Sequence, residues 1–246
     1  MQIDPGVYLV GSGQFGFDMT DTYDCNIYLF DAGATYVMFD IGSGMGIAQI
    51  LQICECDGLD LDKIDRLFLT HAHSDHGGGA AHLRDHLPVA VTAPKRTAEI
   101  LEAGDEEAVS LPGARAGGIY PSDYTYRACP VEHALESGEI VEIGNLKIEA
   151  IATPGHSHDH HSYLVETPDK RYLVAGDAIF FGGKVILQNT YDCSVPDTNA
   201  SIERLADFDF EALLPGHLAF SLNRGKRHIE AACTIIRNLG CPPQVA

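Results

Sequence analysis

The chain has 246 residues, 45% of them hydrophobic, with 16 Lys and Arg against 35 Asp and Glu. This length suits one large domain or two small ones, and the apolar fraction is enough for a core without disulfide support. The formal net charge of −19 repels phosphate backbones, which argues against nucleic acid as a partner. No apolar run approaches the ~20 residues of a membrane span, so we expect no membrane-spanning segment.

The cysteines and the first residues point to a reducing compartment. The seven cysteines are an odd number with irregular spacing and no Cys-x-x-Cys pair, a pattern typical of free thiols. Residues 1–5 have neither a basic start nor an apolar core, so we expect no signal peptide. Together these features predict a cytoplasmic protein.

The first half of the chain alternates short strands with helices. Strands are expected where Val, Ile, Tyr and Phe gather between Gly and Asp turns, and helices where apolar residues recur at helical spacing. The expected strands are 7–10, 26–30, 35–40, 66–70 and 89–92, and the expected helices are 44–56, 79–86 and 94–103. Residues 104–127 are interrupted by Gly and Pro, and we interpret them as an excursion over the surface.

The second half is again rich in strands and ends in helices. The expected strands are 139–143, 146–151, 162–166, 172–175 and 211–214, and the expected helices are 196–206 and 226–239. Two strand-rich halves that each end in helices predict two sheets face to face with helices outside, an αβ/βα sandwich of the α/β class. We interpret residues 1–246 as a single domain.

Thr70 to Gly78 is the most informative segment. It places three imidazoles and one carboxylate within six residues, directly after an apolar strand-like run: His71, His73, Asp75 and His76. Imidazole and carboxylate are ligands of borderline divalent metals such as zinc. The segment therefore predicts part of a metal site, with further ligands elsewhere in the chain.

Three later positions supply such ligands. His156 follows the strand 146–151, Asp177 follows the strand 172–175, and His217 follows the strand 211–214. Each potential ligand comes just after a short apolar strand, as the first cluster does. Because functional side chains concentrate on loops held by a rigid scaffold, we expect these strand ends to converge on one edge of the sandwich.

These motifs resemble those of the metallo-β-lactamase-fold superfamily, in particular its hydrolase branch of glyoxalase II-like and lactonase-like enzymes. Thr-His-Ala-His-Ser-Asp-His at 70–76 is followed by the later ligands in the family's order. The resemblance implies an αββα sandwich with a two-metal site at one edge. By motif it implies that the first metal is held by His71, His73 and His156 and the second by Asp75, His76 and His217. Asp177 would be the carboxylate that bridges the two metals.

The resemblance predicts two divalent metal ions as cofactors. Zinc is the first choice, and a His/Asp set also accepts iron or manganese. Three neutral imidazoles leave zinc an open position for water, and two cations ~3.5–4 Å apart can share a hydroxide that attacks a carbonyl carbon. Asp75 would orient that hydroxide. The expected protein is a metal-dependent hydrolase of a small ester, lactone or thioester.

Alternatives remain open within the same fold. A mononuclear-iron persulfide dioxygenase and a β-lactam hydrolase share it, and so does a non-catalytic binding member that kept the site. Metal analysis separates the first alternative, since two zincs support hydrolysis and one iron supports oxygen chemistry. We expect His160 to form hydrogen bonds beside the metals without binding them, and His158 and His161 to face solvent.

Three segments are candidates for substrate contact. Phe15, Phe17 and Tyr23 lie in the Gly-rich loop 11–24, where apolar side chains indicate a flap over a substrate or packing on the body of the protein. The excursion contributes Tyr124. In 180–193, Tyr191 would donate a hydrogen bond to a developing oxyanion or pack in the wall of the pocket.

Residues 181–185 depart from the glyoxalase II pattern, which argues against a glutathione thioester. The expected partner is a small-molecule substrate, with neither nucleic acid nor membrane. Homo-oligomerisation stays open.

Overall fold

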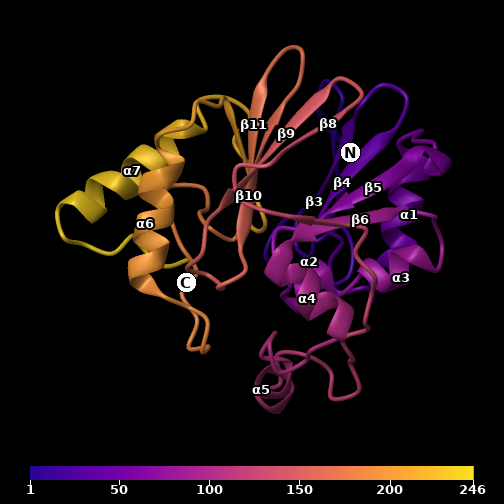
Figure 1. Cartoon of the computed structure of the whole chain (residues 1–246), viewed down its shortest axis with the longest axis horizontal. Helices are drawn as coiled ribbons and strands as arrows, with labels where there is room; N and C mark the ends of the chain where they lie inside the picture. The colour runs from indigo at the N-terminus through magenta and orange to yellow at the C-terminus, as the bar shows by residue number, and fades with distance from the viewer. Residues whose placement is uncertain (246) are drawn as a thin grey trace. The chain divides into compact units, whose positions relative to one another are not determined.

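The computed structural model describes residues 1–245 and shows a mixed α/β fold with two β-sheets (Figure 1). The chain divides into two compact units, Met1–Leu135 and the part that begins at Glu136. The single-domain organisation of 1–246 stays a prediction. Within the described residues, no helix combines the length and the hydropathy needed to cross a bilayer.

Unit 1 holds a seven-stranded sheet whose strands lie in sequence order. Its first four strands pair antiparallel, and the fourth to the seventh pair parallel. Parallel strands end at the same edge, so the segments after β4 and β5 come together. The strands are β1 (Gln2–Asp4), β2 (Val7–Gly11), β3 (Ile27–Asp31), β4 (Tyr36–Phe39), β5 (Ile64–Phe68), β6 (Ala90–Pro94) and β7 (His133–Leu135).

The helices of unit 1 are short. They are α1 (Ile47–Cys56), the 3₁₀ turn η1 (Leu61–Lys63), α2 (Ser74–Gly77), α3 (Ala80–Arg84), α4 (Lys95–Ala103) and α5 (Leu111–Ala116). The helix expected at 44–56 begins only at Ile47, because Gly42 and Gly44 adopt φ of +71° and +91°, outside the helical region. Asp24 holds this turn, since its carboxylate accepts the Ser43 backbone N–H at 2.9 Å.

The excursion 104–127 packs into unit 1 more deeply than expected. It contains the helix α5, and Tyr124 and Tyr126 are buried in the core cluster of this unit. The Tyr124 hydroxyl donates to the Ser43 carbonyl oxygen at 2.8 Å. The Gly and Pro residues masked this packing in the sequence, because the buried tyrosines show no regular spacing.

Unit 2 holds a five-stranded sheet in the order β12-β11-β10-β9-β8. Its helices α6 (Val195–Leu205) and α7 (Lys226–Arg237) lie side by side in Figure 1, and Ile202 and Ile229 pack in one cluster with Leu173 and Leu213 of the sheet. The strands are β8 (Ile140–Ile143), β9 (Leu146–Ala152), β10 (His161–Glu166), β11 (Arg171–Gly176) and β12 (Ala212–Pro215).

Strand directions in unit 2 bring three strand ends to one edge. β10 pairs antiparallel with both β9 and β11, so these two run the same way, and β12 pairs parallel with β11. The carboxyl ends of β9, β11 and β12 therefore share an edge of the sheet. These are the strands after which His156, Asp177 and His217 follow.

Candidate metal centre

The predicted ligands of unit 1 form what we call the first set, which lies in the turn after β5. His71, His73 and His76 are buried, and the ring centroid of His71 is 4.6 Å from that of His73 and 4.2 Å from that of His76. The short helix α2 begins at Ser74 and carries Asp75 and His76. Asp75 keeps 26% of its side chain exposed, so it is the member of this set that solvent reaches.

Asp40 supports this turn from the end of β4. Its buried carboxylate accepts the Thr70 backbone N–H at 2.8 Å and the Thr70 hydroxyl at 2.9 Å, and it pairs with His76 Nδ1 at 2.9 Å. The other ring nitrogen of His76, Nε2, lies 3.7 Å from Asp75 Oδ2. A carboxylate behind an imidazole fixes the ring orientation and the tautomer that a metal needs.

Sequence reasoning did not single out Asp40. The available signal was a carboxylate at the end of the expected strand 35–40, in an Asp-Ile-Gly sequence. Asp40 also adopts φ of +57°, which few residue types tolerate. Such a position points to a structural role for its side chain.

Cys25 adds a thiol beside this support. Its sulfur and ligand atoms of Asp40 and His76 lie within 4.8 Å of one another. Burial raises the pKa of the Cys25 thiol to about 12, so the thiol is protonated in the metal-free protein. The sequence had indicated only that the cysteines are free, and all seven are free thiols.

The predicted ligands of unit 2 form what we call the second set, which lies at the shared strand edge of this unit. Asp177 Oδ2 is 3.5 Å from His156 Nε2 and 3.4 Å from His217 Nε2, and all three residues are buried. These separations exceed the usual N–H···O hydrogen-bond range of about 2.7–3.2 Å. Two ligand atoms that are each ~2.1 Å from a tetrahedral ion stand about 3.4 Å apart. The donor chemistry and the spacing of this set therefore fit a divalent metal.

His160 and Thr153 brace this second set. The Asp177 backbone N–H donates to His160 Nε2 at 2.9 Å, and His160 Nδ1 lies 2.8 Å from the Thr153 hydroxyl. Both ring nitrogens of His160 thus take part in hydrogen bonds, which confirms the hydrogen bonding expected of this residue. His158 is exposed as expected, whereas His161 is half-buried at the start of β10, and burial lowers its pKa.

The candidate substrate residues differ in exposure. Phe15, Phe17 and Tyr191 are exposed, at 59%, 40% and 58%. Tyr23 is half-buried, and Tyr124 is buried with its hydroxyl bound to Ser43. The Tyr191 ring lies edge-on to His158, 5.9 Å between centroids. The substrate roles of these five residues stay predictions.

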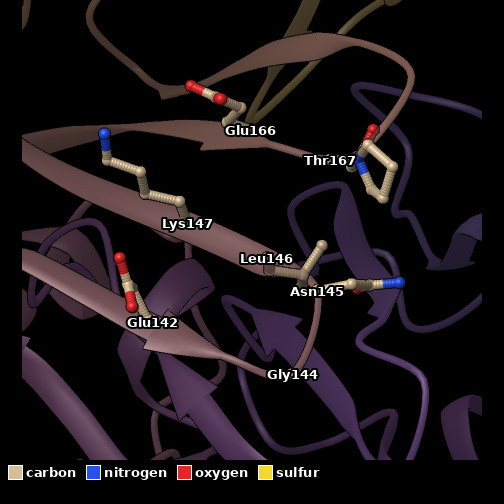
Figure 2. Close-up of a pocket in the computed structure, with 8 residues that line it drawn as sticks. Glu142, Gly144, Asn145, Leu146, Lys147, Glu166 and Thr167 are labelled. Carbon is tan, nitrogen blue, oxygen red and sulfur yellow. The ribbon is translucent and has the colours of Figure 1, made fainter.

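A surface depression of about 250 Å³ lies elsewhere in unit 2. Figure 2 shows Glu142, Lys147 and Glu166 along its strands and Gly144 in the turn between β8 and β9. It surrounds the start of β9, whereas His156 follows the end of that strand. Seven strand residues at ~3.3 Å each put about 20 Å between them. This depression is therefore separate from the ligand set.

The protein is of the α/β class, with two sheets and flanking helices. The His and Asp side chains at the ends of its strands are groups that suit divalent metals. The sequence profile of the Metallo-beta-lactamase superfamily matches residues 20–217. The chain belongs to this superfamily. The match confirms the predicted family, and with the two sheets and their helices it confirms the predicted fold class.

Known proteins of this superfamily are similar over parts of their length. "Hydroxyacylglutathione hydrolase" of Rhodopseudomonas palustris (strain BisB5) is 28% identical over 52% of this chain and 40% of its own length. "Thioesterase pkgB" of Emericella nidulans is 24% identical over 78% of this chain and 45% of its own. The chain thus spans less than half the length of these two relatives.

A solved structure shares the fold over almost the whole chain. The subclass B3 metallo-beta-lactamase of Bradyrhizobium japonicum has a TM-score of 0.74 and 20% identity, over 97% of this chain and 91% of that one. At this identity the likeness shows the fold alone.

Proposed function

We propose that the protein is a dinuclear metal-dependent hydrolase that acts on a small ester, lactone or thioester. The observation that carries the proposal is the ligand spacing around Asp177, where one buried carboxylate lies 3.5 and 3.4 Å from two imidazoles. Membership of the superfamily supports it. The names of two relatives, a hydroxyacylglutathione hydrolase and a thioesterase, support a carbonyl substrate.

In this proposal the ligand residues that the sequence motifs indicate hold two zinc ions. The assignment rests on the family's motif order and on the geometry within each unit. One ion takes His71, His73 and His156, the other takes Asp75, His76 and His217, and Asp177 is shared. The substrate is a small molecule, and the free cysteines favour the cytoplasm as the site of action.

When bound, the ions would supply an acidified water and an electrophile for the carbonyl oxygen. Asp75, partly exposed beside His76, accepts the proton of the attacking water and passes it to the leaving oxygen or sulfur. The new carbon–oxygen bond forms first and puts negative charge on the carbonyl oxygen. The bond from the acyl carbon to the leaving atom then breaks as the carbonyl re-forms and the leaving atom takes the proton from Asp75. Asp40 and His160 hold their ligands in place, and Tyr191 is the proposed donor to the developing oxyanion.

The test is hydrolysis by the purified full chain. We expect zinc-loaded protein to hydrolyse 4-nitrophenyl acetate, a γ-lactone or an S-methyl thioester. A chelator should remove the activity, and added zinc should restore it. Zinc in buffer alone is the control. Absence of turnover on all three substrates by folded, zinc-loaded protein would contradict the proposal.

A further inference from the structure

Three tyrosine rings of unit 1 form a stack. The ring centroids of Tyr23 and Tyr120 are 5.1 Å apart with planes inclined by 25°, and those of Tyr120 and Tyr124 are 5.0 Å apart with planes inclined by 22°. These separations are typical of offset-stacked aromatic rings. The stack joins the loop 11–24 to the excursion 104–127, two segments that are far apart in the sequence.

The inner end of the stack is fixed beside the turn that carries Asp75. The Tyr124 hydroxyl donates to the Ser43 carbonyl oxygen at 2.8 Å, and a Cβ added at Gly78 would meet that hydroxyl at 2.3 Å. Burial raises the pKa of Tyr120 well above its ordinary value, and the charge of Asp75 is the next cause. Two residues after Tyr23, the Cys25 backbone N–H donates to the Asp75 carbonyl oxygen at 3.1 Å, so the loop that carries Tyr23 ends beside Asp75.

Exposed apolar side chains lie close to the stack in sequence. Phe15 and Phe17 belong to the same loop as Tyr23, and Ile119, which is 61% exposed, precedes Tyr120. The loop is closed by hydrogen bonds from Gly13 N to Asp24 O at 2.9 Å and from Gln14 N to Thr22 O at 3.2 Å. Large apolar side chains held in solvent by an ordered loop often mark a binding surface.

The charge of this region disfavours an anionic substrate. Residues 1–62 contain nine aspartates, one glutamate and no lysine or arginine. In the excursion, Arg115 pairs with Glu106, and Arg127 lies 2.7 Å from Asp85. These arginines are already engaged by carboxylates, so the protein's own side-chain charges favour a neutral acyl group over an anionic one here.

We propose that the tyrosine stack binds the acyl side of an uncharged substrate with a flat, aromatic acyl group, and that it selects against anionic thioesters. The inference rests on the proposed hydrolase function and narrows its substrate class. Tyr120 lies between the other two rings, so Tyr23 is the outer ring of the stack, against which the substrate ring packs, and Tyr120 supports Tyr23 from behind. Because one stacked contact changes affinity by roughly tenfold, the selection is measurable.

The experiment compares three thioesters: S-methyl thiobenzoate, S-methyl thioacetate and benzoyl-coenzyme A. We follow hydrolysis by proton NMR and divide each kcat/KM by the rate constant for alkaline hydrolysis of the same compound. The zinc-loaded protein should prefer the neutral benzoyl thioester over each of the others by about tenfold. Tyr120→Leu and Tyr23→Leu should each reduce the benzoyl-to-acetyl ratio by roughly tenfold, mainly through KM.

Tyr36→Leu is the matched control, because Tyr36 begins β4 at the opposite end from Asp40 and should leave the ratio unchanged. A ratio unchanged in both stack variants, or benzoyl-coenzyme A as the preferred substrate, overturns the inference. Binding of N-methylbenzamide, an inert neutral probe, gives a second readout. If the protein hydrolyses none of the thioesters but binds the probe saturably and through Tyr120, only the thioester part of the proposed function is contradicted. If folded protein does not bind the probe, the role of the stack is overturned.

Discussion

The two ligand sets are built in different ways. In unit 1, four proposed ligand side chains come from one six-residue segment after β5. In unit 2, three ligand side chains come from three separate strand ends, after β9, β11 and β12. The first set depends on a local turn and on Asp40, whereas the second depends on the register of a sheet. A set that lies within one segment and a set that comes from separate strands are thus stabilised by different residues. Substitutions of those residues can distinguish the two sets.

Asp177→Asn should have the largest effect. It replaces the carboxylate between two imidazoles of unit 2 by an uncharged amide, which binds a metal ion more weakly. We expect hydrolysis to fall by at least ~10³-fold, with fewer than two zincs per chain. Metal analysis by mass spectrometry and kcat/KM measure the two effects, and circular dichroism checks the fold. Full zinc content with unchanged turnover would remove Asp177 from the ligand set.

Asp75→Asn, in the contiguous set of unit 1, should have the second largest effect, a loss in kcat of about 10²–10³-fold. An amide cannot take the proton that this carboxylate is proposed to transfer. The control is Asp169→Asn, an exposed aspartate in the turn before β11, far from the strand ends that precede the ligands. If turnover of aryl ester and lactone is unchanged in Asp75→Asn, the proton-transfer role is wrong.

Asp40→Ala should separate stability from metal affinity in unit 1. Removal of the acceptor leaves the buried Thr70 N–H and His76 Nδ1 without this partner, which costs about 1–3 kcal/mol of unfolding free energy in the metal-free protein. Zinc affinity should fall by roughly 10–100-fold. Urea unfolding and zinc titration measure these effects.

The matched control is Asp31→Ala, since Asp31 ends β3 at the opposite edge of the same sheet. It should leave zinc affinity unchanged. Equal effects of the two substitutions on zinc affinity would contradict the positioning role of Asp40.

His160→Gln should have the smallest effect, in unit 2. It disturbs the acceptor of the Asp177 backbone N–H and the contact with Thr153. We expect about tenfold weaker zinc binding, at the low end of the range for groups that support a ligand. A zinc affinity equal to that of the wild type would show that the sheet alone positions Asp177.

The sequence predicted the local set more completely than its supports. His71 to His76 could be identified because their order is contiguous, and His156, Asp177 and His217 because each follows an apolar strand. Asp40 and Cys25 were missed, because their roles depend on which strands are neighbours in the sheet, which a single sequence does not reveal. The burial of Tyr124 and Tyr126 was missed for a similar reason, since they pack from an irregular segment.

The most direct test of the central claim is the metal content of the purified full chain, measured together with ester hydrolysis. The two ligand sets predict about two zincs per chain in active protein, and loss of both metal and activity on chelation. One iron per chain, with oxygen uptake on a persulfide substrate and no hydrolysis, would contradict the claim and support the dioxygenase alternative.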